Sequence, residues 1–341
     1  MAKKKFWSII LGIIISVVFL YLIFRNVNFR ELASILKDAQ YLWLLPNLFF
    51  VVFAMFQRAE RWKYMIQPIA RLKYGKLLSA TCIGFMANNV LPLRLGEFVR
   101  AYALAYNENR ITKSASLATI FVERMVFDLL ALLLILVVIL IFVPIEIDDK
   151  FKLGVALSLA VAIAGLIFAL AIVTKPEGSG RLLTKYLFFL PARINDIIRN
   201  TIVKFSRGLL FLKDWRKMAW VSGHTIFLWL CMGISNIFVF WVFHIDLPVY
   251  ASYVLLVVVS ISILIPSSPG FIGVYHGGVV WTLHMFGVGT DKAVSCAIVL
   301  HAAQFIPITL MGFVYLYREG LSLKQLEQAA LQENDNSKSN D

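Results

Sequence analysis

Cysteine and acidic residues are scarce in this sequence, and charge of either sign is thinner than in soluble proteins. The three cysteines, Cys82, Cys231 and Cys296, all fall in apolar segments and show no metal-ligand spacing. We expect them to pack as small hydrophobic residues, without a disulfide. Only 16% of the residues are charged, whereas about 25% is usual for soluble domains. A soluble enzyme or a disulfide-stapled domain is therefore a poor description of this chain.

The sequence is rich in hydrophobic residues. They make up 60% of the 341 positions, and the mean hydropathy is +0.78. They gather in long runs, and roughly 20 apolar residues in a helix cross the hydrocarbon core of a bilayer. The net charge of +13 lies in the short stretches between the runs. It therefore indicates membrane topology and attraction to anionic headgroups, and we expect no nucleic-acid partner.

The runs predict an all-α fold, a polytopic membrane helix bundle. Full spans are expected at 6–24, 41–57, 114–143, 151–173, 218–243 and 293–317. The first run follows three lysines, as in a signal peptide, but it is too long for one and ends without a small-residue cleavage pattern. We therefore expect it to be retained as the first helix.

Loop charge sets the predicted orientation. The 58–76 and 174–217 connections are strongly basic, whereas 144–150 and 244–250 are short and acidic or neutral. The positive-inside rule then predicts a multi-pass protein of the plasma membrane with both termini in the cytoplasm. Apolar residues recur at near-helical spacing within 174–217, which fits an interfacial amphipathic helix or a solvated cytoplasmic hairpin. Residues 319–341 are expected to form a disordered cytoplasmic tail.

Two further apolar stretches, 77–104 and 251–287, are interrupted by helix-breaking and polar residues. Backbone freed from helical bonding is tolerated at membrane depth only where protein or a water-filled cavity satisfies it. We therefore predict two re-entrant hairpins. The first break contains Asn88, Asn89, Pro92, Arg94, Gly96, Glu97 and Arg100. The second contains Pro266, Ser267, Ser268, Pro269, Gly270 and Gly273.

The two breaks also suggest an internal repeat. Pro92 to Gly96 and Pro266 to Gly270 share the spacing Pro-x-x-x-Gly, and each follows two predicted spans. Residues 1–143 and 144–318 would then be two membrane halves, inverted relative to each other because each has three crossings. Inverted repeats with broken helices are common in transporters.

Charged residues also occur inside the predicted span 114–143, where they are costly. Glu123 lies close to mid-bilayer, and Arg124 and Asp128 can pair at i, i+4 on one helix face. Glu123 faces another way, and Arg94 or Arg100 is its natural partner. One interpretation is a buried ion network that braces the bundle. The other is an arginine-rich cavity, open to the cytoplasm, for an anionic lipid headgroup. Arg58 and Arg61 are expected at the cytoplasmic end of the second span, as topology determinants or at the cavity mouth.

The last span offers His301 and Gln304 on one face, and a lone intramembrane histidine is more often a packing residue than a proton carrier. No Ser/His/Asp constellation, phosphate-binding glycine loop or metal-ligand cluster is visible. We therefore expect no catalytic residue, no metal and no cofactor.

These motifs together resemble the lysylphosphatidylglycerol synthase transmembrane, or flippase-like, family over roughly residues 6–318. The resemblance is carried by Arg61-Trp62, the run from Asn88 to Arg100, Glu123-Arg124 with Asp128, and the run from Pro266 to Gly273. It implies the membrane module of multiple peptide resistance proteins, which is assigned translocation of aminoacylated phosphatidylglycerol. Bifunctional members also carry an acyltransferase domain, for which residues 319–341 leave no room, so we expect no lysyltransferase activity.

The leading functional hypothesis is a flippase-like protein that translocates an anionic or phosphate-bearing lipid between leaflets. The alternatives are a membrane-embedded transferase acting on lipid-linked substrates and a non-transporting assembly partner of a lipid or glycan synthase. Membrane lipids are the expected partners, and a homo-oligomer or a partner synthase is left open.

Overall fold

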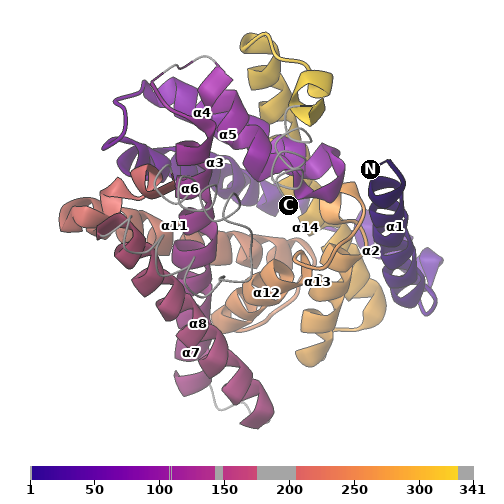
Figure 1. The fold of residues 1–341 in the computed structure, drawn as a ribbon. Helices are drawn as coiled ribbons and strands as arrows, with labels where there is room; N and C mark the ends of the chain where they lie inside the picture. The colour runs from indigo at the N-terminus through magenta and orange to yellow at the C-terminus, as the bar shows by residue number, and fades with distance from the viewer. Residues whose placement is uncertain (1, 107, 109, 143–148, 175–204, 329–341) are drawn as a thin grey trace.

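The computed structural model describes residues 2–106, 108, 110–142, 149–174 and 205–328, which form helices and their connections with no β-strand among them (Figure 1). The prediction of an all-α fold is confirmed for this part of the chain. Elements labelled η are short 3₁₀ helices, except η3, which is a π-helix. In chain order the elements are α1 (Ala2–Phe24), α2 (Phe29–Lys37), η1 (Tyr41–Trp43), α3 (Leu44–Ile66), α4 (Tyr74–Val90), η2 (Pro92–Arg94), α5 (Gly96–Tyr106), α6 (Lys113–Val122), η3 (Glu123–Asp128), α7 (Leu129–Phe142), α8 (Asp149–Thr174), η4 (Leu210–Lys213), α11 (Trp215–Val242), α12 (Val249–Ser262), η5 (Pro269–Phe271), α13 (Val274–Met285) and α14 (Thr290–Arg318).

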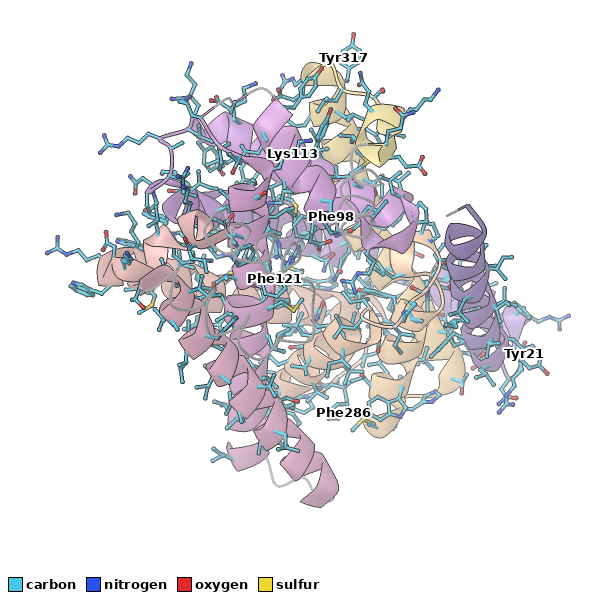
Figure 2. All side chains as sticks on the ribbon, viewed as in Figure 1. Tyr21, Phe98, Lys113, Phe121, Phe286 and Tyr317 are labelled. Carbon is cyan, nitrogen blue, oxygen red and sulfur yellow. The ribbon has the colours of Figure 1, made fainter. Side chains whose placement is uncertain are left out.

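Five helical segments are long and apolar enough to cross a membrane, namely Tyr41–Ile66, Lys113–Ile141, Ala156–Thr174, Trp215–Val242 and Thr290–Arg318. A sixth, Ile10–Phe24, passes the same test together with α2, which follows at a bend of 86°. These segments coincide with the six predicted spans, so the prediction of a membrane helix bundle is confirmed. Large apolar side chains also point away from the bundle, such as Tyr21 (67% exposed) and Phe121 (56%) (Figure 2). Such faces suit contact with lipid.

The second span is longer than predicted. Its predicted end at residue 57 was placed before Arg58 and Arg61, but α3 continues to Ile66, about two and a half turns further. Both arginines are buried there. Charged residues close a span when they face lipid or water, whereas these two meet carboxylates inside the bundle. The loop between α3 and α4 keeps the basic residues Arg71 and Lys73.

Two helical hairpins occupy the predicted breaks. α4 and α5 pack along each other and are joined at η2, and α12 and α13 pack in the same way across the segment that contains η5. The 3₁₀ helices begin at Pro92 and Pro269, so the two turns correspond at these prolines rather than at Pro92 and Pro266. The turns also contact each other. The helix breaks are thus confirmed, while re-entry on one membrane face and the inverted repeat stay predictions.

Glycines allow the first hairpin to close tightly. A β-carbon on Gly96 would lie 2.2 Å from the carbonyl oxygen of Gly84. One on Gly84 would lie 2.6 Å from the β-carbon of Arg100, on the facing helix. Small residues are the usual means by which membrane helices approach closely. This packing fixes where Arg100 enters the bundle.

The segments beyond the spans lie partly within the described residues. Residues 175–204, where we predict an amphipathic helix or a hairpin, lie outside the described residues. Leu209 and Phe211 follow them and are fully buried in the core. At the other end, the predicted disordered tail 319–341 is ordered over 319–328, because Leu321 and Leu326 pack into the same core. Residues 329–341 are outside the described part.

Candidate functional site

Three charged residues of the span Lys113–Ile141, namely Glu123, Arg124 and Asp128, lie in a π-helical turn. In η3, from Glu123 to Asp128, the backbone N–H of Leu129 bonds the carbonyl of Arg124, five residues earlier. In an α-helix, residues five apart diverge by about 140° around the axis, because each residue turns about 100°. The wider turn brings Glu123 and Asp128 toward one side. Such π-bulges are rare and frequently occur at functional sites.

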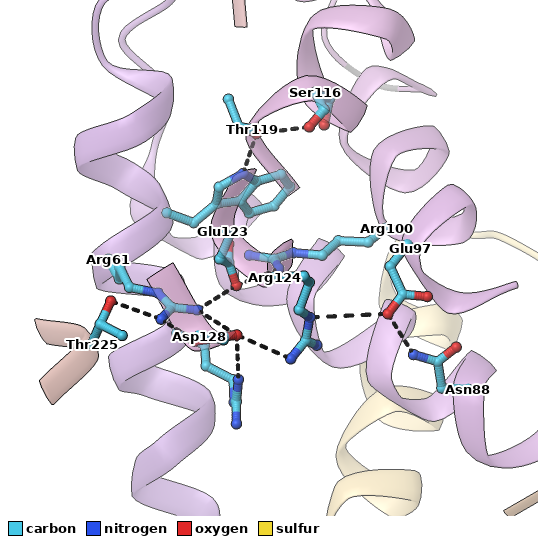
Figure 3. A network of polar contacts seen from close by, with 12 residues as sticks. Arg61, Asn88, Glu97, Arg100, Ser116, Thr119, Glu123, Arg124, Asp128 and Thr225 are labelled. Carbon is cyan, nitrogen blue, oxygen red and sulfur yellow. Dashed lines mark hydrogen bonds and ion pairs between the residues drawn. The ribbon is translucent and has the colours of Figure 1, made fainter. Parts of the chain in front are cut away.

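Arg61 of α3 binds both carboxylates at once. Its Nη2 donates to Glu123 Oε1 at 2.7 Å, and its Nη1 donates to Asp128 Oδ1 at 2.6 Å and to Thr225 Oγ1 at 3.0 Å. Arg61 and Glu123 are fully buried. Figure 3 shows the guanidinium of Arg61 between these acceptors. The expectation that Arg61 lies at the cytoplasmic end of a span or at a cavity mouth is therefore wrong.

Arg100 completes this inner network from α5. Its Nη1 donates to Glu123 Oε1 at 3.0 Å, and its guanidinium carbon lies 3.9 Å from the ring centroid of Trp62. Of the two partners predicted for Glu123, Arg100 is therefore the one that binds it. Arg61, Arg100, Glu123 and Asp128 brace α3, α5 and the π-turn together, as the bracing interpretation expects.

Arg94 lies elsewhere and joins the two hairpins. It adopts a positive φ of 54°, which is uncommon for a residue other than glycine. Its Nη1 donates to the carbonyl of Ile263, the residue that follows α12, at 2.8 Å. Its guanidinium carbon lies 5.3 Å from the ring centroid of Phe271, in the turn of the second hairpin. Arg94 is thus a latch between the hairpin turns.

The amides predicted in the first break hold that turn in shape. Asn88 accepts from the N–H of Gly96 at 2.8 Å and donates to Glu97 Oε1 at 3.2 Å. Asn89 donates to Thr309 Oγ1 of α14 at 2.9 Å. One amide therefore closes the hairpin on itself, and the other ties it to the last span.

The second turn depends on residues outside its own segment. Gly270 and Gly273 have positive φ values of 74° and 91°. His301 of α14 approaches the carbonyl oxygen of Gly270 at 2.8 Å through Nε2, which donates because a carbonyl only accepts. The N–H of Ser268 donates to Ser16 Oγ of α1 at 2.9 Å. No sequence motif pointed to Ser16, an ordinary small residue in an apolar run.

A cavity of about 180 Å³ lies between these elements. It is lined from the first half by α3, α4 and the π-turn and from the second half by α11, α12, α13 and α14. The predicted residues Asn89, Arg124, His301 and Gln304 line it, and so do Arg58, Phe85, Trp229 and Tyr275. Pro266, Ser267 and Ser268 do not.

Two of the lining residues are arginines that have N–H groups without a hydrogen-bond partner among the described residues. Arg58 Nη1 and Arg124 Nη1 approach the same atom, Asp128 Oδ2, at 4.0 Å and 3.4 Å. Their guanidinium carbons lie 4.8 Å and 4.6 Å from the ring centroid of Phe85. Nε and Nη1 of Arg58 and Nε of Arg124 are buried without a hydrogen-bond partner among the described residues. Sequence reasoning offered Arg58 only as a topology or mouth residue and missed Phe85.

The cluster carries more positive than negative charge. Four arginines, Arg58, Arg61, Arg100 and Arg124, surround the two buried carboxylates Glu123 and Asp128. Glu97 is only partly buried and lies 4.0 Å from Arg124. When it is counted with the carboxylates, the arginines are still in excess. Buried charge is costly unless it is paired. An anion in the cavity would supply the missing partner.

Among the residues that the structure describes, no group of three or more His, Cys, Asp or Glu side chains is arranged to hold a metal ion. A wider depression of about 530 Å³ lies elsewhere, between α2 and the loops that follow α11 and α13. It has none of the buried, unpartnered polar atoms that mark the central cavity.

The fold and the site together define a multi-pass membrane protein with an ion cluster inside its helix bundle. The model of one family, the lysylphosphatidylglycerol synthase TM region, matches residues 9–312, and the chain belongs to this family. The family prediction made from the motifs is confirmed. The family name connects the chain with membrane lipids.

One curated relative matches part of the chain. The glycosyltransferase AglD of Haloferax volcanii is 31% identical over 126 residues, which is 37% of this chain and 20% of that protein. The chain thus aligns with about a fifth of the length of this relative. No solved structure matches the chain.

Proposed function

We propose that this protein binds the phosphate-bearing headgroup of a membrane lipid in the central cavity and moves that lipid between the leaflets. The observation that carries the proposal is the pair Arg58 and Arg124. Both line the cavity, both belong to a cluster with excess positive charge, and both carry buried guanidinium N–H groups without a hydrogen-bond partner among the described residues. Guanidinium forks bind phosphate in bidentate fashion and stay charged when water is removed.

The position of the cavity supports translocation rather than binding alone. Its walls come from both halves of the chain and include Ile263 and Phe271, the two residues that Arg94 holds. Releasing the Arg94 latch would therefore change the cavity wall at the hairpin turns. In this proposal the protein lies in the plasma membrane with both termini in the cytoplasm, the hairpins are re-entrant, and acyl chains remain in lipid while the headgroup crosses.

The test uses the purified protein in liposomes that contain a fluorescent phosphatidylglycerol, with dithionite added outside to quench accessible label. We expect wild-type protein to make inner-leaflet label accessible, and the double variant Arg58→Gln/Arg124→Gln to slow this at least tenfold. Arg30→Gln, at an exposed site on α2, is the matched control. The proposal would be contradicted if wild-type protein did not speed up the quenching of any labelled anionic lipid. It would also be contradicted if the double variant were as fast as wild type.

The relative's name supplies a second candidate, a membrane-embedded transferase acting on lipid-linked sugars. Purified protein given a radiolabelled nucleotide sugar and a lipid acceptor would then form labelled glycolipid. The absence of product alongside active lipid translocation would decide against this candidate.

A further inference from the structure

The cavity lining is notable for the kind of charge that is missing from it. Among the described residues that form the lining, none is an aspartate or a glutamate, whereas two are arginines. The polar side chains that remain are neutral, among them Asn89, Gln304 and Tyr275. A headgroup in the cavity would therefore meet positive charge and hydrogen-bonding groups and no negative side chain in the wall.

The nearby carboxylates are already engaged behind that wall. Glu123 is held by Arg61 and Arg100, and Asp128 Oδ1 accepts from Arg61 at 2.6 Å and from Trp229 Nε1 at 3.1 Å. Glu97 is held by the amide of Asn88. These carboxylates offset part of the arginine charge. Glu123 Oε2 is buried without a hydrogen-bond partner among the described residues, but none of the three carboxylates lines the cavity, so the wall itself offers a cation no acidic partner.

The positive charge left over is between one and two elementary charges. The four arginines exceed the two buried carboxylates by two, and they exceed the carboxylates by one when the partly buried Glu97 is counted. A phosphate monoester carries about −1.5 to −2 at neutral pH. A phosphodiester such as phosphatidylglycerol carries a single negative charge, and attaching an aminoacyl group with a free ammonium cancels it.

Donors in the wall fit the oxygens of such a group. The hydroxyl of Tyr275 is buried and has no hydrogen-bond partner among the described residues. Together with the free N–H groups of Arg58 and Arg124, it gives the cavity donors from α3, the π-turn and α13. An ammonium group in the same place would be buried beside arginines without a counter-charge, which is strongly unfavourable.

Building on the proposed function, we infer that the lipid bound here carries a doubly charged phosphate, as a terminal phosphomonoester or a diphosphate, and that the cavity rejects aminoacylated lipids. The preference departs from the lipid in the family name. It follows from this chain's own cavity lining, which contains two arginines and no acidic side chain among the described residues.

The binding test titrates purified full-length protein with short-chain lipids and measures occupancy by native mass spectrometry. The probes are dioctanoyl phosphatidic acid, dioctanoyl phosphatidylglycerol and dioctanoyl lysylphosphatidylglycerol. We expect phosphatidic acid to bind at least tenfold more tightly than phosphatidylglycerol, a difference of about 1.4 kcal/mol, and the lysyl lipid to bind most weakly. Equal affinities, or a preference for the lysyl lipid, would overturn the inference.

A charge placed in the wall gives an independent arm. Gln304→Glu adds a carboxylate of nearly the same shape to the lining, and we expect it to weaken phosphatidic acid binding about tenfold, roughly 1.4 kcal/mol. Gln40→Glu adds the same charge at an exposed position before η1 and should leave binding unchanged. If the two variants had equal effects, binding would not depend on charge in the cavity wall, and the inference would be wrong.

Two further outcomes separate the inference from the proposed function. If phosphatidylglycerol and the lysyl lipid are translocated as fast as phosphatidic acid, and all depend on Arg58 and Arg124, the preference is wrong while translocation stands. If the binding preference holds and no lipid is translocated, translocation fails while the preference stands. Inorganic phosphate that displaces phosphatidic acid at equal concentration would identify a soluble phosphate as the ligand and overturn the lipid assignment.

Discussion

Replacing Arg61 with alanine should lower the free energy of unfolding more than replacing Arg58 or Arg124, the two arginines that line the cavity. Arg61 neutralises two buried carboxylates through bonds of 2.6 Å and 2.7 Å, and its side chain is fully buried. Removing one partner of a buried ion pair typically costs about 3–5 kcal/mol, because the other charge is left uncompensated. The variant therefore tests whether the inner network is dry and bracing.

The structure places the expected cost near the lower end of that range. Without Arg61, Glu123 keeps Arg100 at 3.0 Å, and Asp128 keeps Trp229 at 3.1 Å and Arg124 at 3.4 Å. We therefore expect a loss of about 3 kcal/mol. At about 2 °C per kcal/mol for a chain of this size, the melting temperature should fall by about 6 °C.

The assay is thermal unfolding of detergent-purified protein followed by intrinsic tryptophan fluorescence, with Arg30→Ala as the exposed control. Adding Glu123→Gln and Asp128→Asn to Arg61→Ala should deepen the loss, since Arg58, Arg100 and Arg124 are then left without their carboxylate partners. A melting temperature of Arg61→Ala equal to that of wild type, or a triple variant as stable as wild type, would refute the argument that a buried charge network holds these helices.

Three further predictions follow from other contacts. Gly96→Ala should destabilise the protein by about 1–3 kcal/mol, because its β-carbon would meet the carbonyl of Gly84 at 2.2 Å, whereas Gly75→Ala meets nothing within 4 Å, and thermal unfolding compares the two. Arg94→Gln should release the latch between the hairpins. A cysteine introduced at Asn89 should then react faster with a maleimide than the same cysteine does when Arg94 is intact. Equal rates would argue against the latch. Asp214 caps the first turn of α11, and its hydrogen bond with Lys217 lowers the pKa of its carboxyl. The stabilisation from this cap is present above the ordinary carboxyl pKa and is lost as pH falls through the lowered pKa. The protection of the Arg216 and Lys217 amides, measured relative to their intrinsic exchange rates at each pH, should therefore fall in strong acid, but not in Asp214→Asn.

The spans and the helix breaks could be predicted because each depends on local composition. An apolar run such as 293–317 has few alternatives to a membrane helix. Pro92 and Pro269 stand among glycine and polar residues, and this combination favours a break in the helix. The pairing of Arg124 with Asp128 also followed from their spacing and is present at 3.4 Å.

The position of Arg61 could not be predicted, because it depends on partners far along the chain. A basic residue after an apolar run ordinarily ends a span. Here Asp128 and Thr225, 67 and 164 residues away, make burial favourable, and α3 runs on past it. The π-turn was missed for a related reason: nothing in the segment from Glu123 to Asp128 distinguishes it from an α-helix until Arg61 draws both carboxylates to one side.

Asp128 joins the inner network to the two arginines that line the cavity. Its Oδ1 accepts from Arg61 and Trp229, and its Oδ2, which Arg61 reaches at 3.4 Å, is also the atom that Arg58 and Arg124 both approach. Any phosphate that recruits those arginines must compete with a resident carboxylate, and when it departs they have an acceptor to return to. A carrier has to hold its cargo weakly enough to let it go. Competition from Asp128 Oδ2 limits the affinity of the cavity for an anion, and so favours release of the bound lipid.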